Sequence, residues 1–181
     1  EAFFFYIYVT QESDVKAMVD KTVEVFGRLD IAFNNAGAYG ESPSLSEQLD
    51  SEYDRIMNVN VRGVWLSMKH EIAQMQSQGN GAIVNTSSIL GVVAMPSIPL
   101  YTSSKYAVEG LTKAAALQYA KSGIRINAVG PGAIATEMFE TATGGQDEAK
   151  ADMAGIHPMG RVGQPSEVAN AVLWLSSDDA S

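Results

Sequence analysis

A tyrosine and a lysine, Tyr101 and Lys105, are spaced four residues apart in a stretch with helical periodicity. Residues at i and i+4 share one helix face, so the ammonium can lie near the phenol. A phenol ordinarily has a pKa of about 10, too high for a base near neutrality, and a neighbouring positive charge favours the phenolate. The pair could therefore act as an acid/base catalyst, although solvated helix faces also carry these two residue types by chance.

A run of hydroxyl side chains, Thr86-Ser87-Ser88, comes before this pair, with Ser88 thirteen residues ahead of Tyr101. A serine hydroxyl at a strand end could hydrogen-bond a substrate oxygen and hold it against the tyrosine. Ser87 is the rival for that role.

Two further stretches follow predicted strands. The sequence NNAG at 34–37 either forms a tight turn or contributes to a ligand site. The sequence NAVGPGAIAT at 127–136 runs from a strand into a loop whose glycines and proline permit close approach to a flat ligand, and its alternative is a plain strand-to-loop turn.

The elements that position these residues alternate between strand and helix patterns. Apolar runs predict strands, amphipathic or long runs predict helices, and Gly27 lies where a left-handed helix cap is expected. The predicted strands are 1–9, 29–33, 82–86 and 124–129, and the predicted helices are 12–26, 52–78, 101–121 and 165–176.

This alternation predicts one α/β domain over residues 1–181, a doubly wound, Rossmann-like parallel sheet in three α/β/α layers. Ligands bind such sheets beyond the carboxyl ends of the strands, where the polar stretches above are located.

Composition narrows the function classes. Acidic residues outnumber basic ones by 21 to 12, giving a net charge of −9 without a basic cluster, so nucleic acid is a poor partner. The absence of cysteine excludes disulfides and thiolate chemistry and suits the cytoplasm. The apolar start EAFFFYIYV is far shorter than the ~20 residues of a spanning helix, so no membrane partner is expected.

Taken together, these motifs resemble the short-chain dehydrogenase/reductase family, in the branch similar to 3-oxoacyl reductases and glucose dehydrogenases. The resemblance implies hydride transfer between NAD or NADP and a secondary alcohol or ketone. It also implies a catalytic tetrad, in which Tyr101 exchanges the proton, Lys105 lowers the tyrosine pKa and binds the nicotinamide ribose, and Ser88 orients the substrate oxygen. Asn60 would hold a relay water; its alternative is a helix-kinking polar residue satisfied by backbone.

The resemblance also implies a coenzyme site. Residues on its adenosine side would be Asn34, Ala36 and Gly37, and residues at the nicotinamide would be Pro131, Gly132, Ile134 and Thr136, together with Tyr101 and Lys105. The stretch 160–169 is interpreted as structural. No metal site is expected, and His157 is assigned a surface or loop position.

The segment after the nicotinamide loop is a mobile lid in this family. Met138, Met153 and Met159 could line the substrate pocket there or only pack helices. Family members usually form homodimers or homotetramers, and Met68, Ile72 and Met75 are spaced either for such contacts or for the internal core.

The pattern departs from the family at both ends. The glycine-rich phosphate turn and the residue that selects NAD or NADP do not occur, Tyr8 replaces an aspartate that usually contacts adenine, and the usual last strand is absent. We therefore expect a truncated domain, and a non-catalytic fragment or interaction module is the alternative function. One hypothesis is that residues 3–9 pair directly beside residues 29–33, because an unpaired apolar edge invites aggregation.

Overall fold

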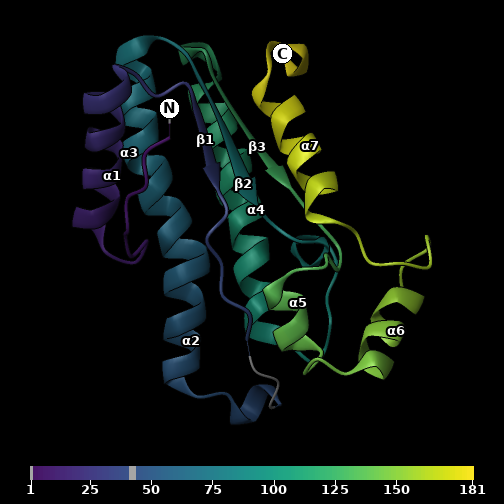
Figure 1. Ribbon diagram of the computed structural model, residues 1–181. Helices are drawn as coiled ribbons and strands as arrows, with labels where there is room; N and C mark the ends of the chain where they lie inside the picture. Colours follow the sequence, from purple (N-terminus) through teal and green to yellow (C-terminus); the bar gives the residue numbers. More distant parts are fainter. Residues whose placement is uncertain (1, 41–43) are drawn as a thin grey trace.

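The computed structural model describes residues 2–40 and 44–181. Within them the sheet has three parallel strands in the order β1-β2-β3. Strand β1 spans Ile31–Asn34, β2 spans Gly81–Thr86 and β3 spans Ile124–Val129. Because all three run in the same direction, their carboxyl ends meet at one edge of the sheet, the lower one in Figure 1.

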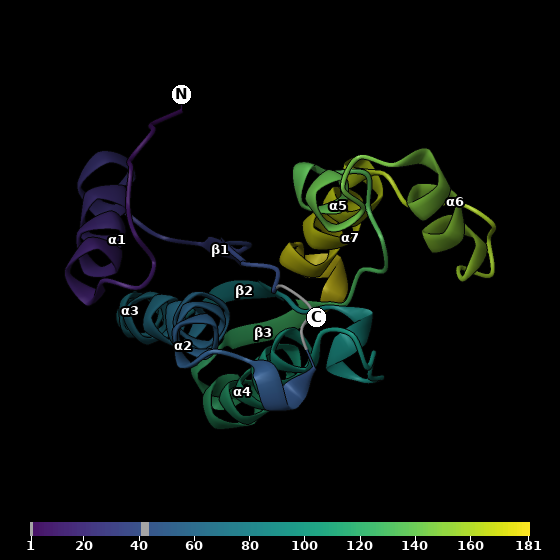
Figure 2. The ribbon, with the colours of Figure 1, turned by 90° about the horizontal axis from the view of Figure 1, so that it is seen from below.

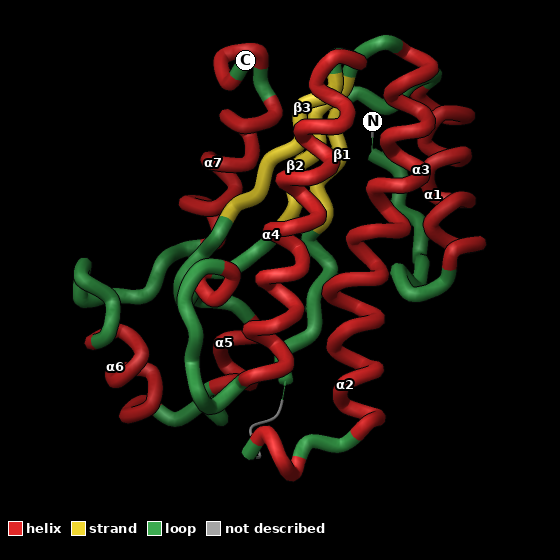
Figure 3. Tube along the Cα trace, turned by 180° about the vertical axis from the view of Figure 1, so that it is seen from behind, coloured by secondary structure: helices red, strands yellow, loops and turns green. Residues whose placement is uncertain are grey.

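Helices cover both faces of this sheet. Helices α3 and α4 pack side by side on one face and α7 packs on the other, while α1 lies against α3 (Figures 2 and 3). The helices are α1 (Glu12–Phe26), α2 (Asp50–Met57), α3 (Gly63–Gln78), α4 (Pro99–Tyr119), α5 (Glu137–Ala142), α6 (Asp147–Gly155) and α7 (Pro165–Ser176). The predicted doubly wound, three-layer fold is confirmed.

The central strand explains why the fold needs helices on both sides. Ile83 and Val84 are adjacent, so their side chains point to opposite faces, and both are fully buried. Ile83 belongs to the core under α3 and α4, whereas Val84 packs with Val129 of β3 and Val172 of α7. A strand buried on both faces is typical of parallel sheets.

Local sequence signals located most elements. The helix 12–26, the strand 124–129 and the helix 165–176 are confirmed with the predicted bounds, and Gly27 caps α1 at a φ of 83°. The predicted helix 52–78 is interrupted by a π-helical segment, η2 (Asn58–Arg62), between α2 and α3. Helices α5 and α6 were not predicted, because segments this short carry a weak periodic signal.

The predicted first strand is wrong for the described residues of the segment, since residues 2–8 join no sheet and Phe4 is 86% exposed. The hypothesis that residues 3–9 pair beside residues 29–33 is wrong too. Instead Tyr8 donates its N–H to Asp14, and Val9 packs so closely on Gly63 of α3 that a Cβ there would lie 2.9 Å from it. Helix packing therefore holds this segment away from β1.

The methionines of α3 belong to the interior of the chain. Met68, Ile72 and Met75 are 0–6% exposed and lie in the core under the sheet. Their spacing thus serves internal packing in this structure.

Candidate active site

The three strand ends bring the predicted site residues to one edge of the sheet. Strand β1 leads into residues 34–37, β2 leads into Thr86 and the two serines, and β3 leads into the loop 130–136. Ser87 donates its N–H to the Val129 carbonyl (2.8 Å), and Ile89 donates to the Pro131 carbonyl (3.0 Å). The serine turn and the loop after β3 are therefore held together by backbone hydrogen bonds.

Lys105 extends from α4 into this edge. Its side chain is buried, and its Nζ donates a hydrogen bond to the Thr86 carbonyl at 2.8 Å. Burial lowers the pKa of Lys105 to about 8, because the interior disfavours the charged ammonium. The ammonium has three N–H donors. Since one of them binds the Thr86 carbonyl, the others can donate to a bound molecule.

Tyr101 lies one helical turn before the lysine, with its ring centroid 5.5 Å from Lys105 Nζ. Burial raises the pKa of Tyr101, and a hydrogen bond with Ser88 opposes that rise. The expected lowering of this pKa by Lys105 is not seen in this structure. The ammonium instead donates to the Thr86 carbonyl, while burial disfavours the phenolate.

The two serines differ in what they face. Ser88 reaches Tyr101 and also accepts a hydrogen bond from the Leu90 N–H at 3.1 Å. Ser87 Oγ lies against the turn at Gly91, where a Cβ would be only 2.6 Å away, and it has no partner among the described residues. The structure therefore brings Ser88, and not its rival, to the tyrosine.

Asn60 lies in the π-helical segment, fully buried. Its Oδ1 accepts from the Ala38 N–H (2.7 Å), and its Nδ2 donates to the Ala38 carbonyl (2.9 Å) and to Ser104 Oγ (3.0 Å). The side chain is thus satisfied largely by backbone, as the alternative interpretation anticipated. π-Helical turns recur at functional sites, and this one holds the segment that includes Gly37.

Gly37 faces both polar residues. A Cβ at this position would lie 3.7 Å from Asn60 Oδ1 and 4.0 Å from Lys105 Nζ. A side chain at this position would therefore lie in contact with the amide of Asn60 and the buried ammonium of Lys105.

Asn34 joins a buried polar network that the sequence did not reveal. Its Nδ2 donates to Glu71 Oε2 and to Asn85 Oδ1, both at 3.0 Å, and Asn85 donates to Thr112 at 2.9 Å. Glu71 is 3% exposed, and burial raises its pKa to about 7. A signal existed, because Glu71 falls within the apolar stripe of Met68, Ile72 and Met75 on the predicted helix.

The stretch 160–169, interpreted as structural from the sequence, binds the loop after β3 through backbone hydrogen bonds. Gly163 donates its N–H to the Ala133 carbonyl and accepts from the Ala135 N–H, both at 2.9 Å. Pro131, Gly132 and Ile134 are half-buried. Thr136 caps α5 by accepting from Phe139 N–H (3.4 Å).

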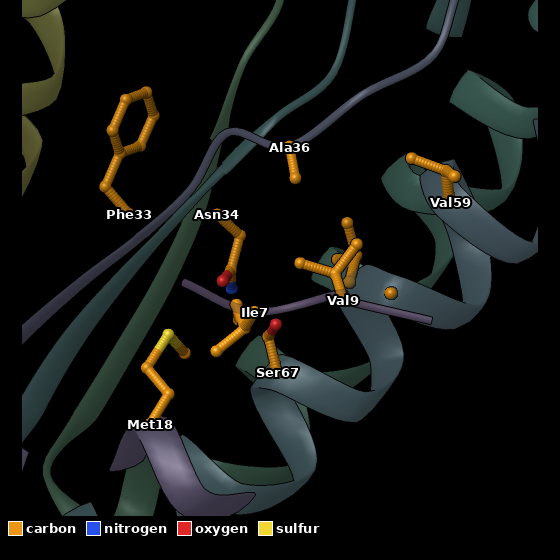
Figure 4. A pocket seen from close by; sticks show the side chains of 10 residues that line it. Ile7, Val9, Met18, Phe33, Asn34, Ala36, Val59 and Ser67 are labelled. Carbon is orange, nitrogen blue, oxygen red and sulfur yellow. The ribbon is translucent and has the colours of Figure 1, made fainter. Parts of the chain in front are cut away.

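A small apolar cavity of about 100 Å³ lies between the N-terminal segment and the end of β1. Figure 4 shows Ile7 and Val9 on one side and Asn34 and Ala36 across from them. Two of the three residues predicted on the adenosine side therefore line it. Ligand pockets usually measure about 300–1,000 Å³, so this cavity alone does not enclose a dinucleotide.

No helix in residues 2–40 and 44–181 combines the length and apolar character needed to cross a bilayer. In the same ranges no three His, Cys, Asp or Glu side chains gather where they could hold a metal ion.

Comparisons with known proteins place the chain among oxidoreductases. Residues 1–181 match the family model described as enoyl-(acyl carrier protein) reductase. The chain is 46% identical over 171 residues to cyclohexanol dehydrogenase of Acinetobacter sp. (strain SE19), covering 94% of this chain and 66% of that protein.

Two solved structures share the fold. One is ElxO with NADP bound, with a TM-score of 0.91 and 39% identity over 98% of this chain and 71% of the other. The second is NAD⁺-bound xylitol dehydrogenase, with a TM-score of 0.90 and 34% identity over 97% and 73% of the two chains. The chain thus spans roughly two thirds to three quarters of the length of these relatives.

Proposed function

Since the chain belongs to the short-chain dehydrogenase/reductase family, we propose that it carries the catalytic centre of an NAD(P)-dependent oxidoreductase acting on secondary alcohols and ketones. The observation that carries the proposal is the meeting of three side chains from two elements. Ser88, two residues after the end of β2, reaches the Tyr101 phenol, and Lys105 lies one helical turn from that phenol in α4.

The chemistry follows from what each group can donate. Tyr101 gives its phenolic proton to the ketone oxygen during reduction and takes the alcohol proton during oxidation. Ser88 holds the same oxygen by a hydrogen bond and keeps it at the tyrosine. The raised pKa of Tyr101 keeps the phenol protonated near neutrality, which suits the acid role in reduction.

Residues around Lys105 fit the nicotinamide half of the coenzyme. The coenzyme supplies the hydride donor or acceptor when it is bound. Lys105 has N–H donors that could bind a ribose hydroxyl, and Gly37 lies beside this ammonium without a side chain of its own. Pro131, Gly132, Ile134 and Thr136 belong to the loop that would hold the carboxamide. Asn34, Ala36 and Gly37 are proposed on the adenosine side.

Asn60 completes the proposed tetrad. Because its side-chain amide is engaged by Ala38 and Ser104, a relay water would have to bind a backbone group of the π-helical segment. Asn60 also fixes the segment that holds Gly37 beside Lys105.

For the substrate we propose a carbocyclic alcohol or its ketone. Similarity to a cyclohexanol dehydrogenase supports this class. The segment after the loop, which the family resemblance assigns to a lid, also carries exposed apolar side chains, with Met138 38%, Ile156 61% and Met159 75% exposed, and such side chains suit an apolar ring. A homodimer or homotetramer in the cytoplasm completes the proposal.

The alternative is a non-catalytic fragment or an interaction module without tight coenzyme binding. The small volume of the cavity beside Asn34 and Ala36 favours it for the residues described.

Calorimetric titration of the chain with NAD, NADH, NADP and NADPH separates the two functions, followed by assays with cyclohexanol and cyclohexanone. Micromolar binding and turnover support the oxidoreductase. A folded chain that binds none of the four nucleotides supports the non-catalytic fragment or interaction module.

A further inference from the structure

The His157 ring joins two segments that are distant in the sequence. Its Nε2 lies 2.9 Å from the Ala133 backbone nitrogen, and its Nδ1 lies 2.7 Å from the Met153 carbonyl oxygen. A backbone N–H can only donate and a carbonyl can only accept. These partners therefore require a neutral imidazole with the proton on Nδ1 and a bare, accepting Nε2.

The His157 ring packs directly against the backbone of Gly132. A Cβ on Gly132 would lie 2.5 Å from His157 Nε2 and 3.0 Å from its Cδ2. Gly132 does not belong to the described glycines with positive φ, so its backbone conformation does not require glycine. The imidazole occupies the space where a side chain would be.

Both backbone polar groups of Ala133 are engaged in hydrogen bonds. Its N–H is bound by His157 and its carbonyl by Gly163 at 2.9 Å. The preceding Pro131 carbonyl is bound by Ile89 next to Ser88. Backbone hydrogen bonds thus join the loop to the serine turn and to Gly163, and among these bonds only the one from Ala133 to His157 involves a side chain.

We propose that His157 is a positioning residue, which fixes the Pro131–Ile134 loop for the nicotinamide and couples it to helix α6. The bond to Met153 supplies the coupling, because Met153 belongs to α6. The assignment of this loop to the nicotinamide rests on the proposed function. The hydrogen bonds themselves do not.

The first test needs neither coenzyme nor activity. Long-range ¹H–¹⁵N NMR of the unliganded 181-residue chain reports which imidazole nitrogen carries the proton. His70 is the other histidine, so a His70→Gln variant assigns the signals. A protonated Nδ1 and bare Nε2 on His157 are expected, and the opposite tautomer or a doubly protonated ring at neutral pH overturns the proposal.

The second test follows the loop itself by amide hydrogen exchange. His157→Leu removes both hydrogen bonds, so exchange at Ala133 should quicken by about tenfold, the effect of losing one net hydrogen bond. His157→Gln keeps an acceptor that can reach the Ala133 N–H and should restore most of the protection. Equal acceleration along the whole chain, or no acceleration at Ala133, contradicts a local positioning role.

A third test separates this proposal from the proposed function. With coenzyme and substrate, His157→Leu should raise the KM for coenzyme about tenfold with a smaller change in kcat, because the loop contacts coenzyme before and during reaction. His157→Gln should return KM toward the wild-type value. Failure of coenzyme binding by the wild type defeats the proposed function, whereas the tautomer and exchange results still decide the role of His157.

Discussion

Asn34, at the carboxyl end of β1, donates a hydrogen bond to the buried Glu71 carboxyl group of α3 across 3.0 Å. The same amide also donates to Asn85 of β2, so one side chain ties the first strand to the second and to the helix beneath them. A titratable group buried this deeply makes stability depend on pH.

Glu71→Gln should remove part of that dependence. The folded pKa of about 7 exceeds the ordinary 4.5, so between these values the folded chain keeps a proton that the unfolded chain has released. The free energy of unfolding therefore falls as pH rises from about 4.5 to 7, by about 3 kcal/mol as an order of magnitude, and is flat above. Urea denaturation from pH 5 to 8 measures how the free energy of unfolding changes with pH, and this slope should be flatter in Glu71→Gln. The control is Glu24→Gln, which changes an exposed glutamate of α1. An unchanged slope in Glu71→Gln contradicts the raised pKa assigned to Glu71.

Lys105→Met should stabilise the chain while abolishing turnover. The lowered pKa means that the buried ammonium costs roughly 3 kcal/mol at pH 7, a cost recovered as pH rises from about 8 to 10.5. Loss of the hydrogen bond to Thr86 destabilises the chain by about 1 kcal/mol and offsets part of this gain. The free energy of unfolding should therefore rise by about 1–2 kcal/mol in the variant. Thermal and urea unfolding at pH 7 test it against Lys113→Met, an exposed lysine of the same helix. A less stable Lys105→Met would mean that burial does not penalise the ammonium.

Tyr101→Phe should lower kcat by about 10²–10⁴-fold, the usual contribution of a general acid or base. The free energy of unfolding should change by less than about 1 kcal/mol, since only the phenol oxygen is lost. Turnover of cyclohexanone with NADH or NADPH is the assay. Tyr106→Phe, on an exposed tyrosine of the same helix, is the matched control. Retention of full activity would show that another group exchanges the proton.

Ser88→Ala should cost turnover about 10²-fold, in line with the loss of one donor at a developing oxyanion. Ser87→Ala should leave turnover nearly unchanged, because its hydroxyl lies against Gly91. It should not destabilise the chain, since no partner is lost. The pair of variants is assayed side by side, and a larger loss in Ser87→Ala reverses the assignment.

Asn60→Ala should destabilise the chain by about 2–3 kcal/mol, because the Ala38 N–H and carbonyl and Ser104 lose a buried partner. Amide exchange should quicken at Ala38 before it does in the sheet. Urea denaturation with exchange measurements checks both effects, and uniform exchange would mean that Asn60 does not act locally on this segment.

The sequence alone determined the alternation of strands and helices. Apolar runs at 82–86 and 124–129, helical periodicity at 12–26 and the cap at Gly27 are local signals, and local signals set local structure. The spacing of Tyr101 and Lys105 also predicted that these two side chains share one helix face, and both lie on α4.

Tertiary structure decided what the local pattern could not. The run 1–9 has strand-forming residues, yet residues 2–8 form no strand, because a strand needs a neighbour and Val9 is held against Gly63. Glu71, Asn34 and Asn85 pair only once α3 lies on the sheet. His157 reaches Ala133 across twenty-four positions of sequence, and the pKa of Tyr101 rises because the folded chain buries the phenol. Each of these depends on contacts between distant segments, and neither propensity nor periodicity records such contacts.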